Sequence, residues 1–335
     1  MKITESEVLS VLQDLTIDSG VGIDSVSALG ALDYAGLPGW YAAGLPESES
    51  AEPYIHHFPD GNATIARKLV CRLIPDLVSG NSLENLITAK LDYGLLDDPR
   101  NDVSVRLNST VINVQNNKSA GGTVTVSYVR DNQLEKVSAS KCILACNSNV
   151  IPFICPELPD KQKEALAFQV KVPILYTNVA VKNWEAWKNL GIGAMVCPGS
   201  YHIVSMLDFP VTYGNYEFSR NEREPIVIHM ERFPHSYGSN LSAREQYKLG
   251  RYELLTTPFE TIERNVREQL ESSLSEGGFN AAKDILGITV NRWSHGYSYW
   301  YNPLFDPIYD DYNDSRYPHI CLLYTSDAAD EEDSV

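Results

Sequence analysis

The sequence lacks both a long apolar run and an excess of positive charge. None of its stretches approaches the ~20 consecutive apolar residues that a membrane-spanning helix needs. Lys and Arg together number 27 against 44 for Asp and Glu, which gives a formal charge of −17. Because nucleic-acid binding needs clustered cations, we expect no nucleic-acid partner. Because no apolar run is long enough, we expect no membrane segment. The acidity would attract a cationic ligand at long range, although solubility is the simpler explanation.

The patterns that mark metal and disulfide sites are also missing. The six cysteines include no Cys-x-x-Cys pair. Cys142 and Cys146 stand in a short apolar run, where cysteine usually acts as a small buried hydrophobe. We therefore expect neither a disulfide framework nor a metal centre.

No complete dinucleotide-binding fingerprint occurs in the chain. Gly20-Val-Gly22 and Gly191-Ile-Gly193 each lack the third glycine of the Gly-x-Gly-x-x-Gly pattern. That pattern binds a pyrophosphate only where a strand, a tight glycine turn and a helix come together. A phosphate loop, a zinc-protease motif, a serine-hydrolase elbow and an EF-hand are absent from the sequence as well.

What is present is a series of helical and strand patterns. Helical spacing predicts helices over 2–16, 63–77 and 184–190 and within 245–274. Alternation of apolar and polar residues predicts strands over 103–107, 110–114, 123–129, 134–137, 172–181, 226–230 and 288–293. The continuous apolar run 142–146 predicts a strand that is buried on both faces. The order of elements over 160–300 predicts a mixed sheet with helices on one side.

The most informative stretch is 57–69, which reads His-Phe-Pro-Asp-Gly-Asn-Ala-Thr-Ile-Ala-Arg-Lys-Leu. It is a turn-rich loop followed by a helix start, where Asp60 or Asn62 is expected to cap the helix. Such a helix N-terminus presents amides and the positive end of a dipole to an anion. The stretch resembles the His-Phe-Pro-Asp-Gly-Asn-Ala/Ser-x-Ile-Ala-Arg-x-Leu segment of spermidine dehydrogenase-like proteins, which belong to the FAD-dependent amine oxidase superfamily.

Further segments resemble the same family in the same order. They are residues 22–28, 142–152, 171–184 and 292–306. The resemblance implies an α/β plus α+β fold, with a partial FAD-binding domain of the glutathione reductase-like kind and a mixed-sheet substrate domain. The implied ranges are 1–50 (helical and loop part of the substrate domain), 51–160 (partial FAD-binding domain), 161–290 (substrate-binding domain), 291–320 (return segment toward the FAD domain) and 321–335 (a non-native tail that resembles a translated sequencing adapter).

The cofactor that the resemblance implies is FAD. The implied cofactor-binding residues are Asp60, Gly61, Asn62, Arg67, Val111 and Ala145. The family's glycine-rich first unit and its closing flavin segment are not found in this sequence. We therefore expect the chain to be an incomplete and inactive fragment that binds FAD weakly or not at all.

The implied reaction is oxidation of a C–N bond of an amine, with FAD as the hydride acceptor and a further electron acceptor as partner. Polyamines such as spermidine are the implied substrates, because carboxylates and aromatic faces hold cations. The implied substrate-binding residues are Trp293, Tyr297, Tyr299 and Asp306. The three aromatic residues alternate, so one strand face could hold all of them.

A lysine stands near the flavin in many amine oxidases, in a strand that reads Tyr-Thr-Lys. The similar strand here reads Tyr176-Thr177-Asn178, so Asn178 takes the implied catalytic position. Lys171 is the second candidate, although its odd spacing from Asn178 sets it on the opposite strand face.

Two other interpretations stay open at this point. One is an FAD-dependent desaturase-type reaction of the same superfamily, which would need a long apolar tunnel for its substrate. The other is a non-catalytic, degenerate fragment. No signal-peptide pattern is visible, and we expect a soluble protein of a bacterial-type cytoplasm or periplasm, with the compartment left open.

Overall fold

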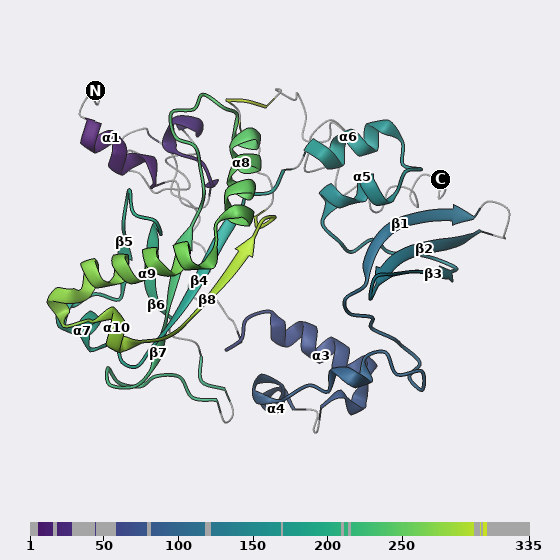
Figure 1. Ribbon diagram of the computed structural model, residues 1–335, viewed down its shortest axis with the longest axis horizontal. Helices are drawn as coiled ribbons and strands as arrows, with labels where there is room; N and C mark the ends of the chain where they lie inside the picture. The colour runs from purple at the N-terminus through teal and green to yellow at the C-terminus, as the bar shows by residue number, and fades with distance from the viewer. Residues whose placement is uncertain are drawn as a thin grey trace.

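The computed structural model describes residues 6–15, 19–28, 44, 58–78, 82–117, 122–168, 170–208, 211–213, 216–297, 302 and 304–306. Within these residues the chain forms one sheet of three strands, one sheet of five strands, and helices. Figure 1 shows the two sheets on opposite sides of the molecule. No helix in the described ranges is long and apolar enough to cross a membrane.

The larger sheet has the strand order β5-β6-β7-β4-β8. Its strands are β4 (Ile174–Val181), β5 (Ala194–Val196), β6 (Val204–Asp208), β7 (Ile226–Arg232) and β8 (Ile285–Trp293). The strands predicted at 172–181, 226–230 and 288–293 are confirmed, whereas the sequence pattern does not reveal β5 and β6. Every neighbouring pair is antiparallel, so the predicted mixed sheet is wrong. From β5 to β7 the strands follow one another without a crossover helix, which is the connection that antiparallel neighbours use.

Helices cover one face of this sheet. Alternate side chains of β4 and β7 are apolar, and Leu175, Val179, Ile228 and Met230 are completely buried. They pack against α7 (Glu185–Leu190), α8 (Ala243–Thr256) and α9 (Phe259–Leu274); α9 runs across the strands in Figure 1. Burying each such side chain contributes roughly 1.5–3 kcal/mol. On the opposite face Ile174 and Val204 are buried in a second cluster, while Tyr176, Asn178, His229 and Glu231 are partly exposed.

The helical pattern predicted within 245–274 is confirmed as two helices rather than one. Ser242 begins α8 with a capping box, in which its hydroxyl and backbone N–H bond reciprocally with Glu245. Pro258 stands at the start of α9, where a proline is tolerated because the first backbone N–H groups of a helix have no partner inside it.

The smaller sheet is a meander of β1 (Thr110–Asn117), β2 (Thr123–Arg130) and β3 (Gln133–Ala139), paired antiparallel in that order. The strands predicted at 110–114, 123–129 and 134–137 are confirmed. The strand predicted at 103–107 is wrong: this segment is irregular, and the Val105 amide bonds to the Leu96 carbonyl at 2.7 Å.

The strand predicted at 142–146 is also wrong. The segment is irregular, Cys142 and Cys146 are exposed, and 91% of the Ile143 side chain faces solvent. A strand buried on both faces needs neighbouring strands to satisfy its backbone groups. Among the described residues no strand pairs with this segment.

The helix predicted over 63–77 is present as α3 (Ala63–Leu73), followed by the short 3₁₀ turn η3 (Pro75–Leu77). Pro75 explains the early end, because proline disfavours helical backbone in the residue before it. The buried residues of this region are Cys71, Ile74, Leu77 and Val78, together with Leu86 and Leu96. Ile65 and Leu69 face outward instead.

The helices predicted over 2–16 and 184–190 are present as α1 and α7. The remaining elements are α1 (Ser6–Gln13), η2 (Ile23–Ser25), α4 (Leu83–Thr88), η4 (Tyr93–Leu95), η5 (Ser148–Val150), α5 (Ile151–Ile154), α6 (Asp160–Phe168), η6 (Ser275–Gly277) and α10 (Ala281–Asp284).

Candidate functional site

The face of the larger sheet that the helices leave uncovered carries a group of polar and aromatic side chains. Because side chains alternate along a strand, Tyr176 and Asn178 of β4 lie on this face. In β7 the same face carries His229 and Glu231. The strand register pairs Tyr176 with Glu231 and Asn178 with His229, so all four side chains lie within reach of one another.

The His229 ring has a polar partner at each nitrogen. Its Nδ1 lies 2.9 Å from Oδ1 of Asn178, and its Nε2 lies 3.0 Å from Oε1 of Glu231. The oxygen and nitrogen of an Asn amide are assigned from the hydrogen-bond network. Both partner atoms in this structure are oxygens, and the roles of the two ring nitrogens depend on the tautomer of His229. The side chains of His229 and Glu231 are 24% and 16% exposed, so solvent still reaches the pair.

Two tyrosines border this cluster. The Tyr176 ring meets the His229 ring edge-on, with centroids 4.9 Å apart. The hydroxyls of Tyr176 and Tyr297 lie 2.8 Å apart, although Tyr297 follows β8 and Tyr176 belongs to β4. The Tyr297 carbonyl accepts a hydrogen bond of 3.0 Å from the Val172 amide, which fixes the backbone that carries the second tyrosine. A ligand at the cluster would therefore meet aromatic rings as well as a carboxylate.

Sequence reasoning missed His229 and Glu231. The signal was available in the strand 226–232, which reads Ile-Val-Ile-His-Met-Glu-Arg. A His and a Glu two positions apart in an otherwise apolar strand must lie on one face. Their meeting with Asn178 depends on the pairing of β4 with β7, which local sequence does not contain.

The predicted aromatic wall is only partly assembled. Trp293 is the last residue of β8 and is 53% exposed. The chain then turns at residues 294–295, so the shared strand face predicted for Trp293 and Tyr297 does not continue between them. Tyr299 lies outside the described residues.

The predicted acid and lysine take other positions. The Asp306 carboxylate is fully buried, with Oδ1 3.4 Å from Nη1 of Arg244 and Oδ2 accepting a 2.8 Å hydrogen bond from the Asn302 amide. It therefore faces a protein cation rather than an open surface. Lys171 is partly exposed in the stretch before β4.

The residues implied to contact FAD stand on separate elements. Asp60 does not cap α3; its carboxylate contacts the Thr64 hydroxyl and lies 2.7 Å from Nη1 of Arg67. Gly61 has φ +65°, a left-handed backbone that suits glycine, and Asn62 makes no capping bond either.

The other two implied contacts lie elsewhere. Val111 stands beside a bulge in β1 and is 38% exposed, and Ala145 lies in the exposed segment after β3. None of the six residues lines the hollow around Asp14 and His235. Taken alone, they do not form a pocket that fits a flavin.

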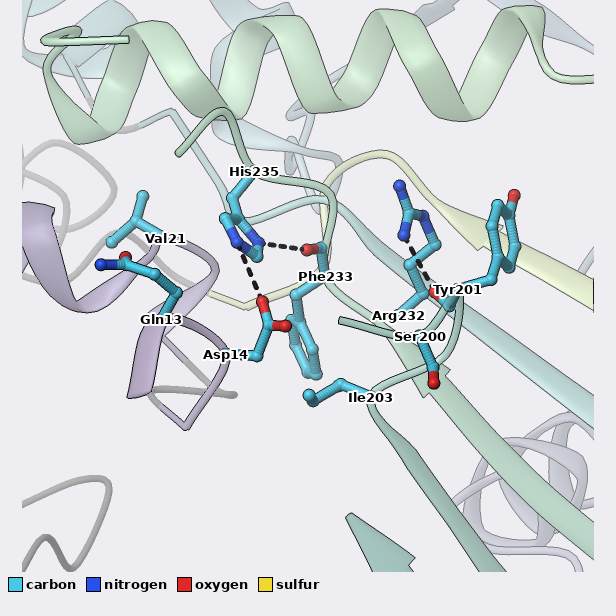
Figure 2. A pocket seen from close by; sticks show the side chains of 9 residues that line it. All are labelled: Gln13, Asp14, Val21, Ser200, Tyr201, Ile203, Arg232, Phe233 and His235. Atoms are coloured by element: carbon cyan, nitrogen blue, oxygen red, sulfur yellow. Dashed lines mark hydrogen bonds and ion pairs between the residues drawn. The ribbon is translucent and has the colours of Figure 1, made fainter. Parts of the chain in front are cut away.

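That hollow lies beside the sheet, with room for one or two water-sized groups in about 30 Å³. Figure 2 shows its lining from the α1 turn, from the turn after β5 and from the end of β7. The lining residues are Gln13, Asp14, Val21, Ser200, Tyr201, Ile203, Arg232, Phe233 and His235. Phe233 lines this hollow and also lies near the Asn178 cluster, because its ring centroid is 6.2 Å from that of Tyr297.

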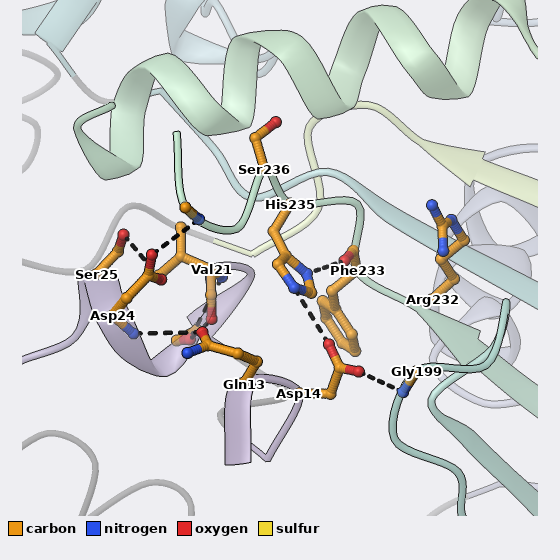
Figure 3. A network of polar contacts seen from close by, with 12 residues as sticks. Gln13, Asp14, Val21, Asp24, Ser25, Gly199, Arg232, Phe233, His235 and Ser236 are labelled. Atoms are coloured by element: carbon orange, nitrogen blue, oxygen red, sulfur yellow. Dashed lines mark hydrogen bonds and ion pairs between the residues drawn. The ribbon is translucent and has the colours of Figure 1, made fainter. Parts of the chain in front are cut away.

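The polar contact at the centre of this hollow is an ion pair between Asp14 and His235 (Figure 3). The hydrogen bond to Asp14 raises the pKa of His235 against the opposing effect of burial. Burial opposes ionisation of Asp14, but the hydrogen bonds from His235 and the Gly199 amide outweigh it and keep the pKa of the carboxyl below its usual value. Asp14 and His235 therefore bond to each other and to neighbouring backbone groups, and their role is to stabilise the fold.

A second histidine lies behind the sheet. His202 is fully buried, and its Nε2 lies 3.0 Å from the Thr177 hydroxyl. Burial, together with the charge of Arg232, lowers the pKa of His202 to about 3, so this ring is neutral near pH 7. Among the described residues no group of three or more His, Cys, Asp and Glu could hold a metal ion.

Comparison with known proteins gives structural likeness only. No protein-family profile and no curated protein sequence matches the chain. The chain is similar to wild-type putrescine oxidase bound to putrescine, at 15% identity and a TM-score of 0.35, over 56% of this chain and 34% of that one. It is similar to cyclohexylamine oxidase from Brevibacterium oxydans IH-35A, at 12% identity and a TM-score of 0.35, over the same shares.

A double mutant of putrescine oxidase matches over more of the chain. Its identity is 15% and its TM-score 0.38, over 90% of this chain and 65% of that one. The matched region therefore spans about a third of the first two proteins and less than two thirds of the third.

Proposed function

We propose that this chain supplies the amine-binding sheet of an FAD-dependent oxidoreductase that oxidises C–N bonds, with polyamines such as spermidine as substrates. In this proposal residues 51–160 belong to a partial FAD-binding domain and residues 161–290 to the substrate domain. One observation carries it. Asn178, which the sequence resemblance aligns with the flavin-side lysine of amine oxidases, lies on the uncovered face of the sheet beside His229 and Glu231.

The chemistry of this face suits a protonated amine. A carboxylate attracts the ammonium charge and accepts its hydrogen bonds, and the faces of tyrosine rings attract a cation. Glu231 offers the carboxylate, while Tyr176 and Tyr297 offer the rings. The role of these residues is to bind and orient the amine. FAD would supply the hydride acceptor when bound.

A desaturase-type reaction on an apolar substrate is supported less well. Such a substrate needs a long apolar tunnel, and the hollow around Asp14 and His235 is small and lined in part by polar side chains. The uncovered sheet face carries a carboxylate, an imidazole and an amide, which an apolar substrate would leave unpaired. An amine substrate therefore accounts for the observed side chains, and an apolar substrate does not.

The experiment that tests the proposal is calorimetric titration of the purified chain with spermidine and with an uncharged diol of similar length. Binding of spermidine without binding of the diol is the expected result. Oxidation is then measured as reduction of an electron-accepting dye in the presence of spermidine and FAD at millimolar concentration. Absence of any amine binding and of any dye reduction would remove the proposal and leave a non-catalytic chain.

A further inference from the structure

We propose that Glu231 is the counter-ion of the substrate's ammonium group, and that Asn178 and His229 are positioning residues that orient its carboxylate. This inference rests on the proposed amine-oxidising function and gives its site a specificity-determining residue. It also replaces Asp306, the acid that the sequence resemblance pointed to, because the Asp306 carboxylate is buried against Arg244.

The Glu231 carboxylate can pair with a cationic ligand. Its nearest charged or chargeable partner is His229, and no Lys or Arg of the described residues forms a salt bridge with it. Two carboxylates near the same sheet differ in this respect: Glu253 is paired with Arg232 and Asp284 with Lys182. A carboxylate that is partly shielded and has no Lys or Arg partner gains free energy when a cationic ligand arrives.

The contacts of His229 orient the Glu231 carboxylate. Oδ1 of Asn178 lies 2.9 Å from Nδ1 of the ring and fixes the plane of the imidazole. Nε2 of the same ring lies 3.0 Å from Oε1 of Glu231 and holds the carboxylate in one orientation. Asn178 thus acts at a distance, through the orientation of His229.

The tyrosines complete a site for a cation rather than for a neutral group. Tyr176 stands directly opposite Glu231 in the strand register, and its hydroxyl is held by that of Tyr297 at 2.8 Å. An ammonium group at Glu231 would therefore lie near aromatic rings whose quadrupole attracts it. A neutral amide or alcohol would gain neither contact, so the cluster selects for protonated amines.

The test compares three purified forms of the whole chain: wild type, Glu231→Gln and Glu164→Gln. Glu164→Gln makes the same charge change on the exposed surface of α6, away from the sheet. Titration with spermidine should give an affinity at least about 10-fold weaker for Glu231→Gln, the size expected for one lost hydrogen bond to a charged group. Glu164→Gln should bind like wild type.

A spectroscopic measurement tests the positioning role. The His229 imidazole resonances should shift when spermidine is added to wild type and should not shift in Glu231→Gln. The buried His202 on the other face of the sheet should remain unchanged in both proteins, which gives an internal reference. An Asn178→Ala variant that keeps its fold should alter the His229 tautomer signals in the absence of ligand and weaken spermidine binding in parallel.

The outcomes separate this inference from the proposed function. Equal spermidine affinity of wild type and Glu231→Gln, without a His229 shift, would overturn the role of Glu231 and leave amine binding standing. Absence of spermidine binding by wild type would overturn both. A loss confined to Glu231→Gln, with the His229 shift in wild type, is the result that the inference requires.

Discussion

The carboxylate of Asp14 lies 3.2 Å from Nε2 of His235, and it accepts a second hydrogen bond of 2.5 Å from the Gly199 amide. These contacts join the turn after α1, the turn after β5 and the loop after β7, three segments that are far apart in the sequence (Figure 3). Both side chains are largely shielded, at 16% and 20% exposure. The N-terminal helix is thereby fastened to the sheet that carries the candidate site.

This ion pair should make the stability of the protein depend on pH in both directions. The folded-state pKa of His235 is raised, so its contribution is complete below the ordinary value of 6.5 and is lost as pH rises through the raised pKa. The folded-state pKa of Asp14 is lowered, so its contribution is complete above 3.8 and is lost as pH falls through the lowered pKa. The pair therefore stabilises the fold most between those values.

Urea unfolding of wild type and His235→Gln over a pH series measures this effect. Near pH 6 we expect the variant to lose roughly 1–3 kcal/mol of unfolding free energy, the range for a buried group left without its partner. The difference should shrink at higher pH. Asp102→Asn, at an exposed position, is the control for a change of charge. A difference between wild type and His235→Gln that is constant across pH would contradict the role of the ion pair.

The buried pair of Arg244 and Asp306 gives a second prediction. Asp306→Asn should lower the unfolding free energy by roughly 1.5–3 kcal/mol, because it removes the charge of a fully buried carboxylate that pairs with Arg244 and accepts the Asn302 amide hydrogen bond. If the role of Asp306 is to hold the fold, the spermidine affinity of the folded variant should equal that of wild type. Chemical denaturation and calorimetric titration of the same preparation measure the two quantities. A selective loss of affinity with unchanged stability would return Asp306 to the substrate site.

Gly250 of α8 provides a packing prediction. A Cβ atom at this position would lie 2.6 Å from the Pro234 carbonyl oxygen and 2.9 Å from Cγ of Pro173. Gly250→Ala gains about 0.5–1 kcal/mol of helix propensity, but overpacking of this kind costs about 1–3 kcal/mol. The expected net result is a lower unfolding midpoint. Gly287→Ala in β8 is the matched control, because nothing lies within 4 Å of its added Cβ; a midpoint shift of the same size there would argue against the clash.

The last prediction concerns the cofactor. The residues implied to contact FAD are spread over the start of α3, over β1 and over the exposed segment after β3. We therefore expect the purified chain to be colourless and to bind added FAD weakly. Absorbance near ~450 nm after gel filtration, a property of the flavin itself, measures this directly. Stoichiometric retention of the flavin would show that these residues come together in solution.

Local pattern in the sequence accounts for most individual elements but not for their pairing. The alternation in 172–181 and 226–230 predicts two strands, since each has one apolar face that must be buried. It does not predict that they are antiparallel neighbours, and so it does not bring His229 to Asn178. The run 142–146 shows the opposite failure, because its composition predicts burial while no described strand lies beside it.

The same limit applies to single polar residues. An acid that follows an aromatic stretch, as Asp306 does, looks available for a ligand in the sequence. Its pairing with Arg244 is set by the packing of α8 against the segment after β8, which is a long-range contact. In contrast, the capping box at Ser242 is local, and its Ser-x-x-Glu spacing is readable directly.

β4 is hydrogen-bonded along both of its edges, to β7 on one side and to β8 on the other. Exchange of its amide hydrogens should therefore require rupture of two ladders and approach the rate of global unfolding. Tyr176 and Asn178 stand on this doubly paired strand, so we expect their backbone to be rigid on the timescale of ligand entry. Any motion at the site is then expected in the segment that carries Tyr297 and not in the strand that carries Tyr176.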